Sequence, residues 1–296
     1  MQKYAEQSMF EHMSQQQAKF FKHWKDRNPW TLEGGKEDKE LIPRALKRLD
    51  YYRALKKKYQ NTPDSVDIVL HKPKKMRVFS FKGTIDTTLS TYDSLRYYKH
   101  FLNTGFLSMD PQSGEIKAWV GGIDFKHFQY DHVEQGKRQP GSTFKPIVYA
   151  TILGEAGKIY SPCFKVVDAP VTFKMDDEKQ SVWVPQNAEG RFSGDTMTLR
   201  QAMARSVNSI TAYMMKIMGK QTPEKVVEYA RRLGIKSHLD PVPSLCLGVF
   251  DVSLYEMVGA YSTFANKGVW TKPYYVSRIE DKHGNILQDF TKERVN

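Results

Sequence analysis

The order of strand-like and helix-like stretches constrains the fold of this chain more than any other feature. Residues 106–109 and 116–120 alternate apolar and polar side chains, and between them lies the turn sequence Asp-Pro-Gln-Ser-Gly at 110–114. After residue 140 the pattern becomes mainly helical, and a second hairpin pattern surrounds Lys-His-Gly-Asn at 282–285. Strands, then a helical block, then strands again predict an α+β fold.

Three helix starts can be placed inside the helical block. Thr198 with Gln201, and Ser253 with Glu256, have the spacing of a capping box, in which two side chains satisfy two unpaired backbone N–H groups. Thr222 is followed directly by a proline, which suits the first helical position, so we expect Thr222 to be the cap of a third helix.

The first hundred residues contain no residues at the spacing of a catalytic motif. Residues 1–30 predict one helix, with an Asn-Pro pair near its end, and residues 31–75 are charged and helical in pattern. A hairpin is predicted over 76–88 and a helix over 90–103. We interpret this part of the chain as a linker or accessory segment.

Composition excludes several kinds of protein. Hydrophobic residues make up 40% of the 296 residues and aromatic residues 12%, which is too much for a disordered chain. No run of about 18 apolar residues is present, so we expect no membrane span. Cys163 and Cys246 are the only cysteines, and His127 and His132 are five positions apart. We therefore expect no disulfide framework, no metal and no cofactor.

The chain is basic, because 45 Lys and Arg residues against 33 Asp and Glu residues give a formal charge of +12. Such a surface could meet nucleic acid, anionic lipid or an acidic polymer, or could simply be solvated. The sequence has no zinc finger, no aromatic RNA-binding signature and no heptad basic region. We expect no nucleic-acid partner.

The segment Ser142-Thr143-Phe144-Lys145 is the clearest chemical signal. Positions i and i+3 share a helix face, so the Ser142 hydroxyl and the Lys145 amine can approach each other. The preceding Pro-Gly pair predicts that Ser142 lies at a helix N-terminus, where unpaired N–H groups favour a developing negative charge. A desolvated lysine can lose its proton near neutral pH and activate the serine. The alternative is a capping serine with a solvated lysine.

A second candidate element is Ser206-Val207-Asn208, which lies between two apolar helical runs. Alternate positions of an extended loop project to one side, so we expect Ser206 and Asn208 to face one cleft with a hydroxyl and an amide. The alternative is a turn or a helix cap, since serine and asparagine both favour such positions.

Residues 135–146 (Gln-Gly-Lys-Arg-Gln-Pro-Gly-Ser-Thr-Phe-Lys-Pro) resemble the nucleophile segment of class A penicillin-binding proteins, which are bifunctional peptidoglycan synthases. The resemblance covers about residues 101–290, and the segments that carry it best are 109–116, 119–122, 206–208, 252–257 and 264–269. The amino-acid sequence of residues 126–132 is similar to that of the Bacteroidetes branch of this family. The resemblance implies a penicillin-binding transpeptidase or serine β-lactamase-like fold, an antiparallel sheet with a helical subdomain.

The resemblance also implies roles for single residues. Ser142 would attack the penultimate D-Ala carbonyl of a D-Ala-D-Ala stem peptide, and Lys145 would take its proton. Ser206 would relay a proton to the leaving D-Ala, and Asn208 would hold the substrate. A stem-peptide amine would then resolve the ester and form the cross-link, while β-lactams would acylate Ser142 as substrate mimics.

Three further residues border the substrate cleft in the matching segment of the family: Trp183, Gln186 and Asn187. A packed loop is the equal alternative for this segment. The partners implied are peptidoglycan stem peptides and their lipid-linked precursor, with β-lactams as inhibitors.

The third motif of the family, Lys-Thr-Gly or Lys-Ser-Gly on a strand, is absent from the sequence, and Lys282-His283-Gly284 fits a turn instead. We therefore expect a fragment, truncated before its C-terminal strands. Residues 1–100 would precede the transpeptidase domain, and 101–296 would be its N-terminal and helical part. A glycosyltransferase domain and a membrane anchor would belong to the parent protein, on the periplasmic face of the inner membrane.

Two other functions remain compatible with the sequence. One is a penicillin- or peptide-binding sensor or scaffold without turnover, because a chain without the third motif could be inactive. The other is a serine β-lactamase, although no Glu-x-x-Leu-Asn segment that would activate water follows Ser206.

Overall fold

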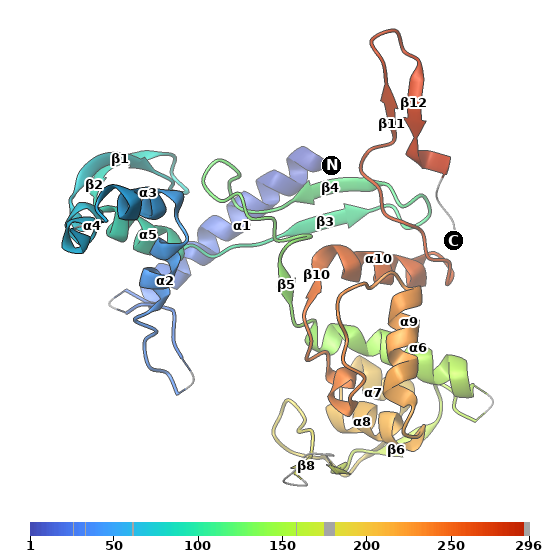
Figure 1. The fold of residues 1–296 in the computed structure, drawn as a ribbon. Coiled ribbons are helices and arrows are strands. Elements are labelled where there is room, and N and C mark those ends of the chain that lie inside the picture. Colours follow the sequence, from blue (N-terminus) through green and yellow to red (C-terminus); the bar gives the residue numbers. More distant parts are fainter. Residues whose placement is uncertain (26, 33, 61, 158, 175–180, 293–296) are drawn as a thin grey trace. The chain divides into compact units, whose positions relative to one another are not determined.

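The computed structural model describes residues 1–25, 27–32, 34–60, 62–157, 159–174 and 181–292 (Figure 1). The chain divides into two compact units. The first, here the N-terminal unit, comprises residues 3–104 and 122–129. The second, here the C-terminal unit, comprises residues 1–2, 105–121 and 130–296.

The N-terminal unit is built from helices and one hairpin. Its elements are α1 (Gln2–His23), α2 (Leu41–Lys47), α3 (Asp50–Lys58), α4 (Pro63–His71), β1 (Lys74–Val78), β2 (Ile85–Leu89) and α5 (Thr91–Lys99). Strands β1 and β2 pair antiparallel, which confirms the predicted hairpin. The predicted first helix ends at His23 and not near residue 30.

Helix α5 begins where the sequence predicts, because the Ser90 hydroxyl accepts a hydrogen bond from the Asp93 N–H. It ends four residues earlier than the predicted Asn103. The reason is Gln17, a buried side chain of α1 that donates to the His100 carbonyl and accepts from the Leu102 N–H. These two bonds replace the helical partners of the last turn.

The C-terminal unit begins with the predicted hairpin and continues into the helical block. Its elements are β3 (Phe106–Met109), β4 (Ile116–Val120), β5 (Lys137–Arg138), η1 (Gly141–Phe144), α6 (Lys145–Ala156), β6 (Lys165–Val167), β7 (Phe173–Lys174), β8 (Val182–Trp183), β9 (Thr196–Thr198), α7 (Leu199–Ala204), α8 (Asn208–Ile217), α9 (Thr222–Arg232), η2 (Pro243–Leu247), β10 (Val252–Ser253), α10 (Leu254–Ala265), β11 (Arg278–Glu280), β12 (Ile286–Asp289) and η3 (Phe290–Lys292).

The predicted α+β architecture is confirmed (Figure 1). Within the described residues the strands form antiparallel pairs, among them β3 with β4 and β11 with β12. Helix α10 packs against β3. Lys282 and His283 lie in the turn between β11 and β12, where the Asp281 carboxylate accepts from the His283 N–H.

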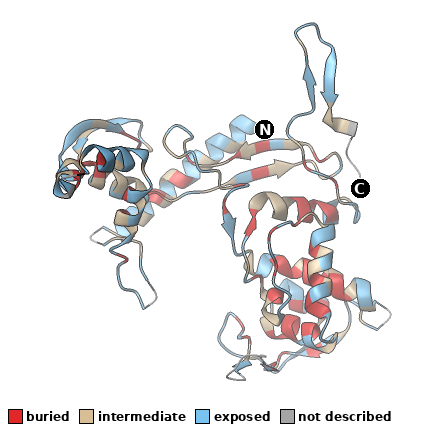
Figure 2. Cartoon of the chain, viewed as in Figure 1, coloured by how far each residue is buried: buried red, intermediate tan, exposed pale blue. Residues whose placement is uncertain are grey.

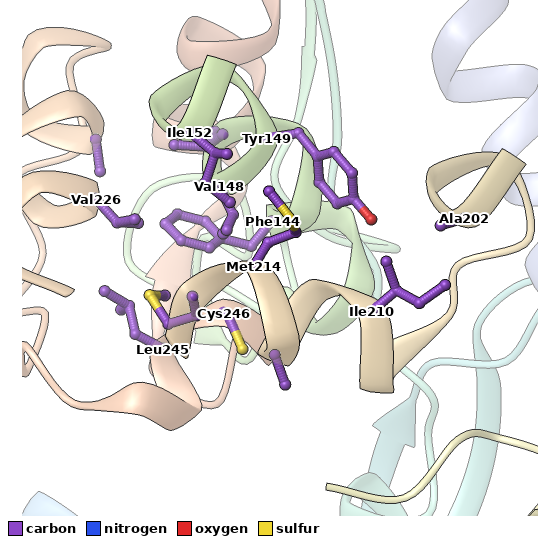
Figure 3. Close-up of a cluster of buried hydrophobic side chains, with 14 of the residues drawn as sticks. Phe144, Val148, Tyr149, Ile152, Ala202, Ile210, Met214, Val226, Leu245 and Cys246 are labelled. Carbon is purple, nitrogen blue, oxygen red and sulfur yellow. The ribbon is translucent and has the colours of Figure 1, made fainter. Parts of the chain in front are cut away.

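The main core lies in the helical block, where most of the buried residues of Figure 2 gather. Figure 3 shows that α6, α8, α9 and η2 each contribute apolar side chains to it, including Val148, Met214, Val226 and Leu245. Burial of these side chains is the main stabilising term of the unit, at roughly 1.5–3 kcal/mol for each large side chain.

The helix caps agree with the sequence in two of three cases. Both capping boxes, Thr198 with Gln201 and Ser253 with Glu256, are present in full. The prediction for Thr222 is wrong, because Gln221 holds the cap position and the Thr222 hydroxyl donates to the Gly219 carbonyl instead. Among the described residues we find no helix that could span a lipid bilayer.

Candidate active site

Ser142 lies in η1, the tight turn that leads directly into α6, as the Pro-Gly-Ser sequence predicts. Three bonds fix this turn. The Gly141 N–H donates to the Gly248 carbonyl at 3.1 Å, the Thr143 hydroxyl donates to the Pro140 carbonyl at 2.6 Å, and the Tyr261 hydroxyl donates to the Thr143 carbonyl at 2.6 Å.

The aromatic residue Phe144 anchors the turn in the core. Its ring is fully buried and meets Phe250 edge to face, with 4.6 Å between the ring centroids. Figure 3 shows it among side chains of α6, α8 and η2. The Ser142 side chain is exposed, so an incoming molecule can reach it, while the turn that carries it is anchored in the core.

Lys145, in contrast to Ser142, is only 2% exposed. Its Nζ donates to the Ser206 carbonyl at 2.5 Å, contacts the Ser206 hydroxyl at 3.1 Å and donates to the Asn208 carboxamide oxygen at 2.7 Å. The three residues therefore form one group, here the lysine centre. The helical spacing predicts that the Ser142 hydroxyl approaches the Lys145 amine, but no hydrogen bond joins these two described groups. The family resemblance assigns Lys145, Ser206 and Asn208 to one site, and their side chains do meet at the Lys145 amine.

The protonation state of Lys145 decides what the lysine centre can do. Burial disfavours the ammonium form and lowers the pKa of Lys145 from 10.5 to about 8. Of its three partners, only the Ser206 hydroxyl can donate as well as accept. In the neutral amine, the Nζ lone pair is therefore free to take a proton from that hydroxyl or from another O–H group brought to the same place.

The segment that carries Ser206 and Asn208 is not the extended loop that we expected. Ser206 has φ of +57°, in the left-handed region, and Asn208 is already the first residue of α8. The Ser206 and Val207 N–H groups bond back to carbonyls at the end of α7. The chain thus reverses tightly between two helices, and this reversal turns both side chains toward Lys145.

The three residues expected to bind substrate differ from one another. Trp183 packs against Phe173, with 5.2 Å between the ring centroids, as a partly buried member of the core. Gln186 has an exposed side chain, while its backbone carbonyl accepts from the Asn208 carboxamide at 2.8 Å. Asn187 is only 7% exposed, and its carboxamide bonds to neighbouring protein groups.

Other residues that position the site gave little or no signal in the sequence. Gly248 has φ of +68° and approaches the Gly141 backbone so closely that a Cβ would lie 2.2 Å from the Gly141 oxygen. Tyr261 holds the Thr143 carbonyl, and the buried Asp168 bonds to Asn187. Only the glycine could have been suspected, because glycine tolerates positive φ.

Replacing Gly248 with alanine should lower the free energy of unfolding by about 3 kcal/mol, because a left-handed Cβ adds strain and also meets the Gly141 backbone. Denaturant unfolding measures this. Gly190→Ala is the matched control, since Gly190 has the same φ of +68° with open space around it, and it should cost only about 1 kcal/mol. Equal losses in the two variants would contradict the close approach.

Among the described residues no group of three or more His, Cys, Asp or Glu side chains is arranged to hold a metal ion. The Cys246 thiol interacts electrostatically with Lys145. Burial raises the pKa of this thiol to about 12, so the thiol stays neutral.

Two family models match the chain. Residues 25–102 match the penicillin-binding protein middle domain, and residues 104–296 match the penicillin binding protein transpeptidase domain. Penicillin-binding protein 1A of Pseudomonas aeruginosa is 34% identical over 195 residues, which are 65% of this chain and 22% of that protein. Penicillin-binding protein 2D of Bacillus subtilis is 34% identical over 188 residues, which are 64% of this chain and 26% of that protein.

Solved structures agree with these matches. Penicillin-binding protein 1A from Haemophilus influenzae has a TM-score of 0.56 at 28% identity, covering 63% of this chain and 27% of that one. A Mycobacterium tuberculosis protein solved in complex with penicillin V shares the fold, with a TM-score of 0.54 at 19% identity, covering 85% of this chain and 65% of that one. The chain spans about a quarter of the length of the curated relatives it matches.

Proposed function

The chain belongs to the penicillin-binding protein transpeptidase family, and from that premise and the site geometry we propose that it supplies the acyl-transferring centre of a peptidoglycan D,D-transpeptidase. The observation that carries the proposal is the lysine centre. A buried amine whose pKa lies near 8 contacts a hydroxyl and a carboxamide one turn away from an exposed serine.

In the proposed reaction, the Ser142 hydroxyl oxygen attacks the carbonyl carbon of the penultimate D-Ala of a stem peptide. Neutral Lys145 accepts the serine proton, directly or through Ser206, whose hydroxyl it contacts at 3.1 Å. The carbon–nitrogen bond to the terminal D-Ala breaks, and that amine leaves with a proton from the lysine centre. An amine of a second stem peptide then attacks the ester and restores Ser142.

The negative charge on the attacked carbonyl oxygen needs a donor. The Ser142 N–H lies in the first turn at the start of η1 and α6, where no preceding helical turn supplies a carbonyl partner. We propose it as one oxyanion donor. The Asn208 carboxamide, held by Lys145 on one side and by the Gln186 carbonyl on the other, is the proposed substrate contact.

Acylation by a β-lactam should depend on pH in a stated direction. Since the pKa of Lys145 is about 8, about one amine in a hundred is neutral at pH 6 and about one in ten at pH 7. The acylation rate should therefore rise about tenfold between these two values and level off above about pH 9. Stopped-flow or quenched labelling measures it. A rate that is flat from pH 6 to pH 9 would contradict a lysine base.

The N-terminal unit has a different proposed part. Since residues 25–102 match the penicillin-binding protein middle domain, we propose that residues 1–100 are an accessory segment of the transpeptidase and contribute no reacting group. The partners proposed for the whole protein are stem peptides, their lipid-linked precursor and β-lactams, on the periplasmic side of the membrane.

The proposal is tested on the full-length gene product in two assays. One measures covalent labelling by fluorescent penicillin, and the other measures cross-linking of a stem-peptide donor to an amine acceptor. A label that persists, together with a cross-linked product, is the expected result. Label that is lost rapidly with release of the opened drug would point to a β-lactamase. Persistent label without any cross-linked product would point to a binding or sensor module, and either of these outcomes would overturn the proposed activity.

A further inference from the structure

A buried carboxylate lies behind the lysine centre and contacts none of its three members directly. Asp168 follows β6 and is only 4% exposed. One of its oxygens accepts from the Asn187 carboxamide at 2.8 Å and from the Ser209 hydroxyl at 2.5 Å. The other accepts from the Ser193 N–H at 2.8 Å. The carboxylate therefore joins the end of β6 to the segment of residues 187–193 and to the first turn of α8.

The charge of Asp168 is compensated by these donors. Burial by itself raises the pKa of a carboxyl group, but the bonds from the Ser193 N–H, the Ser209 hydroxyl and the Asn187 carboxamide outweigh it and hold the pKa of Asp168 below its usual value. Asp168 is thus an anion that accepts from each of these groups and fixes their orientation.

Asn187 transmits this orientation to the lysine centre. Its carboxamide nitrogen donates to Asp168, which leaves its oxygen pointing the other way. That oxygen accepts from the Asn208 N–H at 3.0 Å and from the Ser209 N–H at 3.1 Å, the first two N–H groups of α8. If the carboxamide were rotated by half a turn, it would present hydrogens to those two N–H groups and lose both bonds.

The start of α8 in turn places the lysine centre. Asn208 is the first residue of α8, and its side chain accepts from Lys145 at 2.7 Å. The neighbouring Gln186 carbonyl accepts from the other end of the same side chain. A small shift of the helix start would therefore move the acceptor that faces the Lys145 amine.

We propose that Asp168 is a positioning residue that fixes the first turn of α8, through Asn187 and through its direct bond from Ser209, and thereby places Asn208 and Lys145 for acylation of Ser142. This inference rests on the proposed function. It also changes the expected role of Asn187, which becomes a connector inside the protein and not a group that binds substrate.

The test measures acylation by a chromogenic β-lactam in the full-length gene product, separating the dissociation constant of the first complex from the acylation rate constant. Asp168→Asn keeps the shape and removes the charge, and Asn187→Ala removes the connector. Each should lower the acylation rate constant by about tenfold to a hundredfold, because small displacements of reacting groups are that costly. The dissociation constant should change less than about threefold.

The double variant is decisive. If Asp168 acts in part through Asn187, the two losses overlap, so the double variant should be slowed clearly less than the product of the two single losses. Two independent structural contributions would instead multiply. Asp195→Asn is the matched control, because Asp195 is an exposed carboxylate of the neighbouring chain segment, and it should acylate at the wild-type rate.

If Asp168→Asn fails to fold, Ser209→Ala is measured by itself, since it removes the direct bond from α8 to the carboxylate and leaves the bonds from Asn187 and Ser193. It should lower the acylation rate constant and leave the dissociation constant nearly unchanged. Multiplying losses, or folded variants that acylate within about twofold of wild type, would overturn the inference. A wild-type protein that is not acylated at all would instead refute the proposed function, so the two failures are distinguishable.

Discussion

Replacing Ser142 with alanine should abolish covalent labelling by penicillin, because the oxygen that forms the ester is then absent. The fold should be unaffected, since the Ser142 side chain is exposed and no hydrogen bond links it to another described side chain. The free energy of unfolding should change by no more than about 0.5 kcal/mol, as for most surface substitutions. Gel fluorescence after incubation with labelled penicillin measures the first effect, and denaturant unfolding measures the second.

The control for this variant is Ser277→Ala. Ser277 is an exposed serine of the same unit outside the site, so its variant should label like wild type. Label that persists in Ser142→Ala would show that another residue is acylated, and the proposed nucleophile would then be wrong.

Replacing Lys145 with arginine should lower the acylation rate constant by about 10²–10⁴-fold, the usual contribution of a positioned general base. A guanidinium keeps its charge at any pH that the protein tolerates, so it cannot accept the serine proton. The wild-type Lys145 amine can accept this proton, because burial lowers its pKa to about 8. The rise of the rate between pH 6 and pH 8 should disappear together with the activity.

Lys225→Arg is the matched control for this substitution. Lys225 is a partly exposed lysine of α9 that pairs with Glu155 at 2.8 Å, and an arginine can keep that pair. It should leave the rate unchanged within about twofold. A folding defect would lower the melting temperature and weaken the binding of penicillin before acylation. Loss of the general base alone would leave both unchanged. A Lys145→Arg protein that is folded and acylates at near the wild-type rate would exclude Lys145 as the base.

The features that the sequence predicts well are those fixed by neighbouring residues. The hairpin of β3 and β4 is fixed by its turn, where one Asp110 oxygen accepts from the Gln112 and Ser113 N–H groups. The capping box of Ser253 and Glu256 is likewise complete within four residues. The meeting of Lys145 with Ser206 and Asn208 is a longer-range feature, and it is predictable because residues 135–146 and 206–208 resemble a known family.

The features that the sequence does not predict depend on partners far away along the chain. Helix α5 stops early because Gln17, more than eighty residues before its end, supplies the missing bonds. Asn187 is held by Asp168 and Ser209, and no local pattern links the three positions. The left-handed backbone of Ser206 follows from the close approach of α7 and α8, since serine has no intrinsic preference for that region.

Ser142 is the proposed acylated nucleophile of this chain. The most direct measurement is mass spectrometry of the protein after brief reaction with benzylpenicillin, followed by tryptic digestion. We expect one added penicillin, located by fragmentation on Ser142 in the peptide that comprises residues 139–158. An adduct on any other residue, or no adduct on a folded full-length protein, would contradict it.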